Sequence, residues 1–191
     1  MLRLIQTIVA LSFVGSVFAQ NFEGVIQLNT TNAEQQEEAT VKWYLKDGNS
    51  RMDISSKAEN YSADYSIISD KKGMDMVSQG HVTPVPQVAM KVDNVPQTLL
   101  SQEEGVQMNG YNCTKAVYFD GKNQTTYWLT NDLPISFSDI PFFIQRNMPK
   151  IKSTGFPIKM EKKSPEGSIL LSQDVTSVKE ASVSDSKFDR N

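Results

Sequence analysis

The sequence predicts a mainly β protein built on a strongly curved antiparallel sheet, or half-barrel, with one or two short helices. Apolar and polar residues alternate with period two in most segments, which is typical of strands. Short turns rich in Gly, Asn and Asp separate these segments, and such turns join antiparallel neighbours. A long meander has to curl or be covered to bury its apolar face; a closed barrel or a sandwich is the alternative.

The amino-terminal segment, residues 1–19, is predicted to be a secretory signal peptide. Arg3 supplies a positive charge, residues 4–17 are mostly apolar, and small side chains precede a cleavage site after Ala19. The apolar run is shorter and more interrupted than the ~20 residues that a spanning helix needs. We therefore expect an exported protein, periplasmic or extracellular, with no stable membrane span after cleavage.

The rest of the chain is expected to form one β-rich domain over residues 20–183, followed by a loose tail over residues 184–191. It has the size of one domain and shows no repeat of fixed period. Cys113 is the only cysteine, so stability has to come from a packed core and not from an internal disulfide. The net charge of −3, with lysines scattered among acids, argues against a nucleic acid partner.

The clearest hairpin lies over residues 40–55. Val41, Trp43 and Leu45 alternate with polar residues, and residues 47–49 (Asp-Gly-Asn) tolerate the positive φ of a tight turn. The other expected strands, in chain order, are residues 22–30, 65–70, 73–78, 87–92, 112–120, 124–130, 156–163 and 168–178, with a polar loop over residues 32–38.

Two segments are candidates for short helices. Residues 95–103 could form one or two helical turns. Residues 138–148 begin with a Ser-Asp cap, carry Pro141 in the first turn and end before Pro149. The proline-rich connection over residues 81–88 argues against a central strand, because proline cannot donate to a ladder.

The rare residues gather in the segment over residues 108–134, which is predicted to form two strands joined at Asp120–Gly121. This segment contains Cys113 and Trp128, which could mark either a site or a scaffold hairpin. Cys113 has no CxxC neighbour, and a free cysteine usually packs as a small apolar side chain. We therefore expect a scaffold role for both residues.

No motif in the sequence indicates catalysis. His81 is the only histidine, so a Ser-His-Asp triad, a Cys-His pair and a histidine-based zinc site would all depend on it. Glycine-rich phosphate loops are absent, and the adjacent acids at residues 37–38 and 103–104 are expected to be solvated. We predict no catalytic residue, no metal site and no cofactor, and hence no enzyme; a carboxylate-based hydrolase is the least favoured hypothesis.

Several short motifs resemble those of a bacterial exported family called domain of unknown function 4412. They are the Trp43–Asp53 hairpin, Gly110–Lys115, Tyr127–Thr130 and Gly155–Glu161. The family implies export and carries no established activity. By wider analogy the arrangement is similar to lipoprotein-carrier-like half-barrels, in which a curved sheet holds acyl chains. The resemblance implies that its matched residues are fold determinants. Gly110 would permit a turn before a strand, Cys113 and Trp128 would point to the same covered face, and Pro157 would open an edge strand or start a strand.

Two roles stay open at this point. The concave face could bind an apolar ligand or a lipidated partner, or the protein could be a structural or interaction protein of the cell envelope with a filled core. Methionine and aromatic side chains suit adaptable apolar surfaces. The candidate ligand-facing residues are Trp43, Met74, Met76, Met90, Trp128, Phe142 and Phe143. An open apolar pocket on the concave face would favour the first role.

Overall fold

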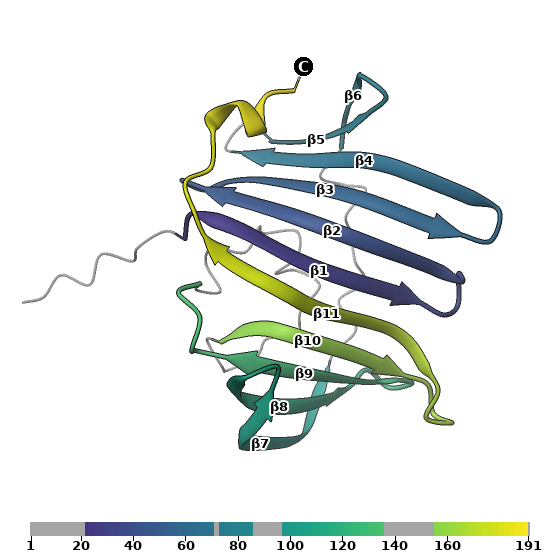
Figure 1. Cartoon of the computed structure of the whole chain (residues 1–191). Coiled ribbons are helices and arrows are strands. Elements are labelled where there is room, and N and C mark those ends of the chain that lie inside the picture. Colours follow the sequence, from purple (N-terminus) through teal and green to yellow (C-terminus); the bar gives the residue numbers. More distant parts are fainter. Residues whose placement is uncertain (1–21, 71–72, 86–96, 136–154, 191) are drawn as a thin grey trace, which may run out of the picture.

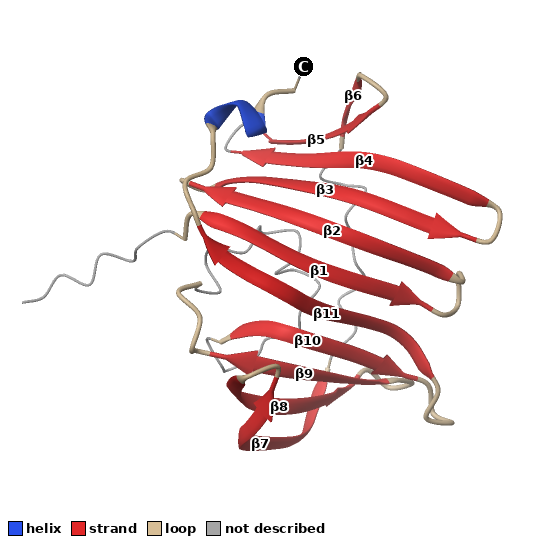
Figure 2. Ribbon diagram, in the orientation of Figure 1, coloured by secondary structure: helices blue, strands red, loops and turns tan. Residues whose placement is uncertain are grey.

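The computed structural model describes residues 22–70, 73–85, 97–135 and 155–190, and these form one open, curved antiparallel sheet of eleven strands (Figures 1 and 2). The strand order is β6-β5-β4-β3-β2-β1-β11-β10-β9-β8-β7, so β6 and β7 are the edges of the described sheet. The predicted mainly β half-barrel is confirmed. The strands are β1 (Gly24–Asn32), β2 (Glu37–Lys46), β3 (Asn49–Ala58), β4 (Tyr61–Asp70), β5 (Gly73–Ser78), β6 (His81–Pro84), β7 (Thr98–Met108), β8 (Tyr111–Phe119), β9 (Gln124–Thr130), β10 (Phe156–Lys163) and β11 (Ile169–Glu180).

Two-residue turns set the register of the sheet. Asp47 and Gly48 connect β2 to β3 with φ angles of 50° and 75°. Asn109 and Gly110 connect β7 to β8 with φ angles of 51° and 83°. Consecutive positive φ angles match the right-handed twist of hairpin strands, and only glycine adopts them without steric cost. The predicted turn role of Gly110 is confirmed.

Among the described residues, the buried side chains form two clusters. Apolar residues spaced by two along a strand share one face, which is why neighbouring strands bring them together. Phe156 and Ile158 of β10 belong to the larger cluster and lie next to a register shift between Pro157 and Lys159. The larger cluster contains Phe22, Ile26, Val41, Trp43, Leu45, Met52, Cys113, Trp128, Ile135, Phe156 and Ile158, and the smaller one Ala116, Tyr118, Tyr127 and Leu129.

The prediction of a helix over residues 95–103 is wrong for the residues of this segment that form strand β7. From Thr98 onward the segment is strand β7, paired with β8 and not helical. Register shifts between Leu99 and Ser101 and between Glu103 and Val106 interrupt the alternation, so period two is hidden in the sequence. The second helix, over residues 138–148, and the strand expected at residues 87–92 lie outside the described residues.

Pro157 lies at the second position of β10, which is paired on both sides by β9 and β11. Its expected place at a strand start is confirmed, but β10 is not an edge strand. The irregular pairing at this point lets a residue without an N–H donor enter a central strand.

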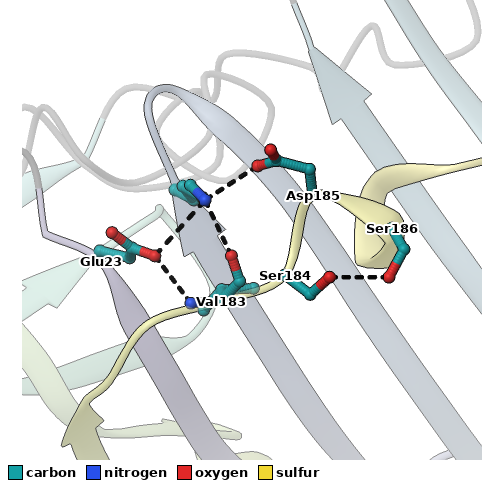
Figure 3. Close-up of polar contacts among 6 residues, drawn as sticks. Glu23, Val183, Ser184, Asp185 and Ser186 are labelled. Atoms are coloured by element: carbon teal, nitrogen blue, oxygen red, sulfur yellow. Dashed lines mark hydrogen bonds and ion pairs between the residues drawn. The ribbon is translucent and has the colours of Figure 1, made fainter.

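The carboxy-terminal residues are anchored, in contrast to the loose tail expected from their polar composition (Figure 3). The backbone N–H of Val183 donates to Glu23 Oε1 (2.7 Å), and Lys46 Nζ contacts both the Val183 carbonyl (2.9 Å) and Asp185 (2.8 Å). A short 3₁₀ helix, η3 (Asp185–Phe188), follows. Arg190 then pairs with Asp70 and Asp75. Ion pairs between distant residues leave no periodic pattern, which is why the sequence did not predict this contact.

Candidate ligand-binding site

One face of the sheet carries a cavity of about 500 Å³ with a mainly apolar wall. Its walls come from both halves of the sheet, with β1, β2 and β3 on one side and β9, β10 and β11 on the other. The apolar lining residues are Leu28, Val41, Trp43, Met52, Ile54, Tyr127, Phe156, Pro157, Ile158, Met160, Leu171 and Val175. This cavity is the candidate site.

Strand pairing explains why these side chains meet. Val41 lies opposite Leu28 on one side and Ile54 on the other, and Leu28 in turn lies opposite Val175. Residues directly opposite one another in a sheet point to the same face. One row of paired residues therefore places four apolar side chains along the floor of the cavity.

The cavity changes from apolar to polar along the strand direction. Met160 of β10 pairs with Tyr127 of β9, whereas Lys162, two residues further, pairs with Thr125. Asp120, in the turn after β8, also lines this end and contacts Lys162 with an N···O distance of 3.3 Å. The polar end is therefore built by the β8–β9 turn and the end of β10.

Asp120 is held as a carboxylate. One of its oxygens accepts the backbone N–H groups of Lys122 (3.0 Å) and Asn123 (2.7 Å). Burial by itself would raise the pKa of Asp120, but these N–H groups and the Lys162 ammonium outweigh it and place the pKa below its ordinary value. The group is thus charged at neutral pH.

Gln97 also lines the cavity, just before β7. Its side-chain oxygen Oε1 is buried and has no hydrogen-bond partner in the part of the chain that the structure describes. A buried acceptor without a donor costs free energy, typically ~1–3 kcal/mol. Thr98, the next residue, pairs with Phe119, the residue before Asp120, so this acceptor lies at the polar end, where a bound molecule could satisfy it.

Of the four described residues that were predicted to face a ligand, Trp43 alone lines the cavity. Its indole N–H donates to Ser50 Oγ (2.7 Å), and the ring lines the apolar part. Trp128 belongs to the same buried cluster as Trp43 but is not a lining residue. Met74 and Met76 of β5 are not lining residues either, and the other three, Met90, Phe142 and Phe143, lie outside the described residues.

Sequence reasoning missed the polar end of the cavity. Asp120 was recognised only as a turn residue, and Lys162 only as a strand residue. Alternation on β10 does place Met160 and Lys162 on one face, but nothing in the sequence says that the β8–β9 turn lies beside them. Long-range pairing supplies that information.

The described residues offer little for covalent or metal chemistry. Among them no group of three or more His, Cys, Asp or Glu side chains could hold a metal ion. His81 is exposed on the edge strand β6. Cys113 is buried, and burial together with the charge of Asp132 raises the pKa of its thiol. The residue therefore packs as a neutral side chain in the core.

Within the described part of the chain, no helix has the length and apolar character needed to cross a membrane.

The chain belongs to the family described as a domain of unknown function, DUF4412, whose model matches residues 22–190. The resemblance found in the short motifs is confirmed by this match. No curated protein matches the sequence.

Solved structures that match the fold share little sequence with the chain. An uncharacterized conserved protein from Thermus thermophilus matches with a TM-score of 0.56 and 11% identity, over 89% of this chain and 85% of that one. MucB in complex with MucA(peri) matches with a TM-score of 0.54 and 11% identity, over 90% of this chain and 55% of that one. The chain thus spans about half the length of MucB. An outer membrane lipoprotein-sorting domain from Vibrio parahaemolyticus also matches, with a TM-score of 0.27 and 10% identity over 87% of this chain and 88% of that one.

Proposed function

We propose that the protein is an exported, non-enzymatic binding protein that holds an apolar ligand chain in the cavity on its sheet. The observation that carries this proposal is the cavity itself, about 500 Å³ with a mainly apolar wall. Small-molecule sites typically measure ~300–1,000 Å³ and combine apolar walls with a few polar groups. The cavity fits this description, so an apolar ligand is favoured over a completely filled core.

The energetics of burial favour a ligand with a chain of methylene groups. Each buried methylene contributes about 0.8 kcal/mol. Association and ordering consume several kcal/mol of that gain, roughly 4–15 kcal/mol in total. A long acyl chain therefore gives a favourable but modest net free energy, and we expect micromolar affinity.

Two carboxylates argue against hydrolysis. Asp120 and Glu161 are each paired with lysine, and the pKa of each lies below its ordinary value. For Glu161, burial by itself would raise the pKa, but Lys159 and Lys163 outweigh it. A glycosidase-type general acid needs a raised pKa, so neither group suits that role.

The export part of the proposal rests on the amino-terminal segment. Residues 1–19 have the charge, apolar run and small residues of a signal peptide. We infer a mature protein that begins near residue 20 and acts in the periplasm or outside the cell. The sheet then forms the binding domain, with residues 184–190 docked on it.

An interaction role in the cell envelope is the second candidate. The observation that favours it is the edge strand β7, where residues 98–105 are all exposed, including Leu99 at 45% and Leu100 at 50%. MucB, which has this fold, was solved as a complex with MucA(peri). A protein partner that adds to this edge would need no open cavity.

Uptake of an apolar dye by delipidated protein tests the proposal. N-phenylnaphthylamine should bind saturably with micromolar affinity. Ile54→Trp should abolish uptake, because Ile54 lines the cavity and a tryptophan ring there would occupy part of the space that the dye needs. Ser55→Trp is the matched control, since Ser55 is the next residue on β3, is exposed and points to the opposite face.

The two variants also separate binding from folding. Overpacking costs about 1–3 kcal/mol, so both variants should be checked by thermal unfolding. Saturable uptake by wild type and by Ser55→Trp, with none by folded Ile54→Trp, supports the proposal. No saturable uptake by wild-type protein would refute it and leave the interaction role.

A further inference from the structure

We propose that the cavity selects a single-chain amphiphile whose head group is uncharged and donates a hydrogen bond, such as a monoacylglycerol. The inference rests on the proposed function and names its ligand class. It predicts weaker binding for a fatty acid or an alkylamine with the same chain.

Residues paired across neighbouring strands form rows, and the order of apolar and polar rows along the strands favours an amphiphilic ligand. The row of Val175, Leu28, Val41 and Ile54 is apolar, and the row that contains Lys162 lies four residues further along β11 and β1. Strands rise about 3.3 Å per residue, so the two rows are about 13 Å apart. A ligand lying along the strands would place an apolar chain at one end and a polar head at the other.

The charges at the cavity wall are already balanced. Asp120 and Lys162 neutralise each other at 3.3 Å. The remaining charged lining residue, Lys159, is held by Glu161 (2.9 Å) and Asp174 (3.6 Å). A head group that carries a net charge would therefore find no unpaired opposite charge among the described lining residues.

Displacing a partner of the Asp120–Lys162 pair is costly. A ligand carboxylate could bind Lys162 only beside Asp120, whose oxygen is fixed by two backbone N–H groups and cannot leave. A ligand ammonium could bind Asp120 only by competing with Lys162. Both cases place like charges together beside the Asp120 side chain, which is only 15% exposed, and this discriminates against charged heads.

The side-chain oxygen of Gln97 indicates, independently of the charge balance, that the ligand head donates a hydrogen bond. Oε1 is buried, accepts no hydrogen bond from a described residue, and belongs to a lining residue. A hydroxyl group on the ligand head can donate to it. A carboxylate cannot, because an ionised carboxylate is an acceptor only.

Competition against bound N-phenylnaphthylamine tests head-group selection. Monomyristoylglycerol, myristic acid and tetradecylamine carry similar chains and should be compared below their micelle-forming concentrations at about pH 8, where the acid and the amine are charged. We expect monomyristoylglycerol to displace the dye at concentrations at least about tenfold lower, equivalent to about 1.4 kcal/mol.

Variants of the charge pair should change the relative affinities of the three amphiphiles. Asp120→Asn leaves Lys162 unneutralised, so myristic acid should gain at least about fivefold. Lys162→Met leaves Asp120 unneutralised, so tetradecylamine should gain instead. Gln97→Met removes the acceptor and should weaken monomyristoylglycerol but not myristic acid, which has no proton to donate. Lys163→Met is the control, because Lys163 is the next residue and loses the same charge but does not line the cavity.

The outcomes distinguish the two proposals. If wild-type protein does not bind the dye, the proposed function fails and the head-group inference fails with it. If the dye binds but the three amphiphiles displace it equally, the head-group inference alone is overturned. Relative affinities that are the same in Asp120→Asn, Lys162→Met and wild type overturn it as well. Should a variant fail to fold, the wild-type comparison still decides.

Discussion

The two tryptophans belong to the same buried cluster but have different neighbours. Trp43 on β2 lines the cavity and donates to Ser50. Trp128 on β9 does not line it, and the ammonium groups of Lys115 and Lys159 lie 5.9 and 5.4 Å from its ring centroid. Both side chains are buried, at 3% and 8% exposure. Burial of a large aromatic residue therefore does not identify a site; open space beside its ring does.

A similar contrast appears within one strand. Tyr44, the neighbour of Trp43, points to the opposite face, where Lys42 and Lys187 lie 5.7 and 4.8 Å from its ring. Lysine ammoniums over aromatic rings contribute about 0.5–1 kcal/mol each at exposed sites. The rings of Tyr44 and Trp128 are thus covered by the protein's own cations, whereas the ring of Trp43 borders a cavity.

Truncating each tryptophan gives the largest expected effect and tests the contrast directly. Trp43→Ala and Trp128→Ala should each lower the free energy of unfolding by about 3–5 kcal/mol in urea titrations. Only Trp43→Ala should also change dye affinity, because only Trp43 borders the bound dye. An equal change of dye affinity in both variants would contradict the assignment of Trp43 alone to the cavity wall.

Releasing the carboxy terminus gives an intermediate effect that is confined to the face opposite the cavity. Arg190→Ala leaves Asp70 and Asp75, whose side chains are mostly buried, without this partner. We expect a loss of about 1–3 kcal/mol in the free energy of unfolding, as for hydrogen bonds to charged groups. Dye binding should be unchanged. Lys57→Ala, an exposed substitution on β3, is a suitable control, and a loss of dye binding in Arg190→Ala would refute the separation of the two faces.

The smallest effect concerns Glu161 and the free energy of unfolding at acidic pH. The pKa of Glu161 is lower in the folded protein than its ordinary value of 4.5, so its contribution is fully present above about that pH and is lost as the pH falls through the lower folded value. Glu161→Gln should therefore be less stable than wild type at neutral pH but lose less on acidification. Thermal melts between neutral pH and about pH 3 would measure this, and parallel curves would show that Glu161 makes no such contribution.

Sequence reasoning predicted most strands because their signals are local. Alternation around Trp43 and the turn at Asp47–Gly48 were sufficient for the β2–β3 hairpin. The edge strand β7 was missed because register shifts at Leu100 and at residues 104–105 break its alternation, and because its exposed residues form no apolar stripe.

The candidate site was predictable only in part. The apolar lining follows from alternation, which placed Trp43 correctly but could not tell which of the two tryptophans borders open space. The pairing of Asp120 with Lys162 and the docking of Arg190 on Asp70 join residues far apart in the chain. Such contacts depend on strand order, which local patterns do not determine.

The position of β11 has a consequence for how the chain acquires its structure. Among the described strands β11 is the last along the chain, yet it pairs with β1, the first, and with β10, and so joins two meanders, β1 to β6 and β7 to β10, into one sheet. Until β11 emerges, each meander has an unpaired central edge, which is a surface prone to aggregation. Closing so long a loop is slow, so completion of the sheet is expected to wait until β11 has been synthesised. A chain that cannot complete its sheet before β11 is synthesised stays unfolded until then. An unfolded chain is the form that can be transported through a narrow membrane channel.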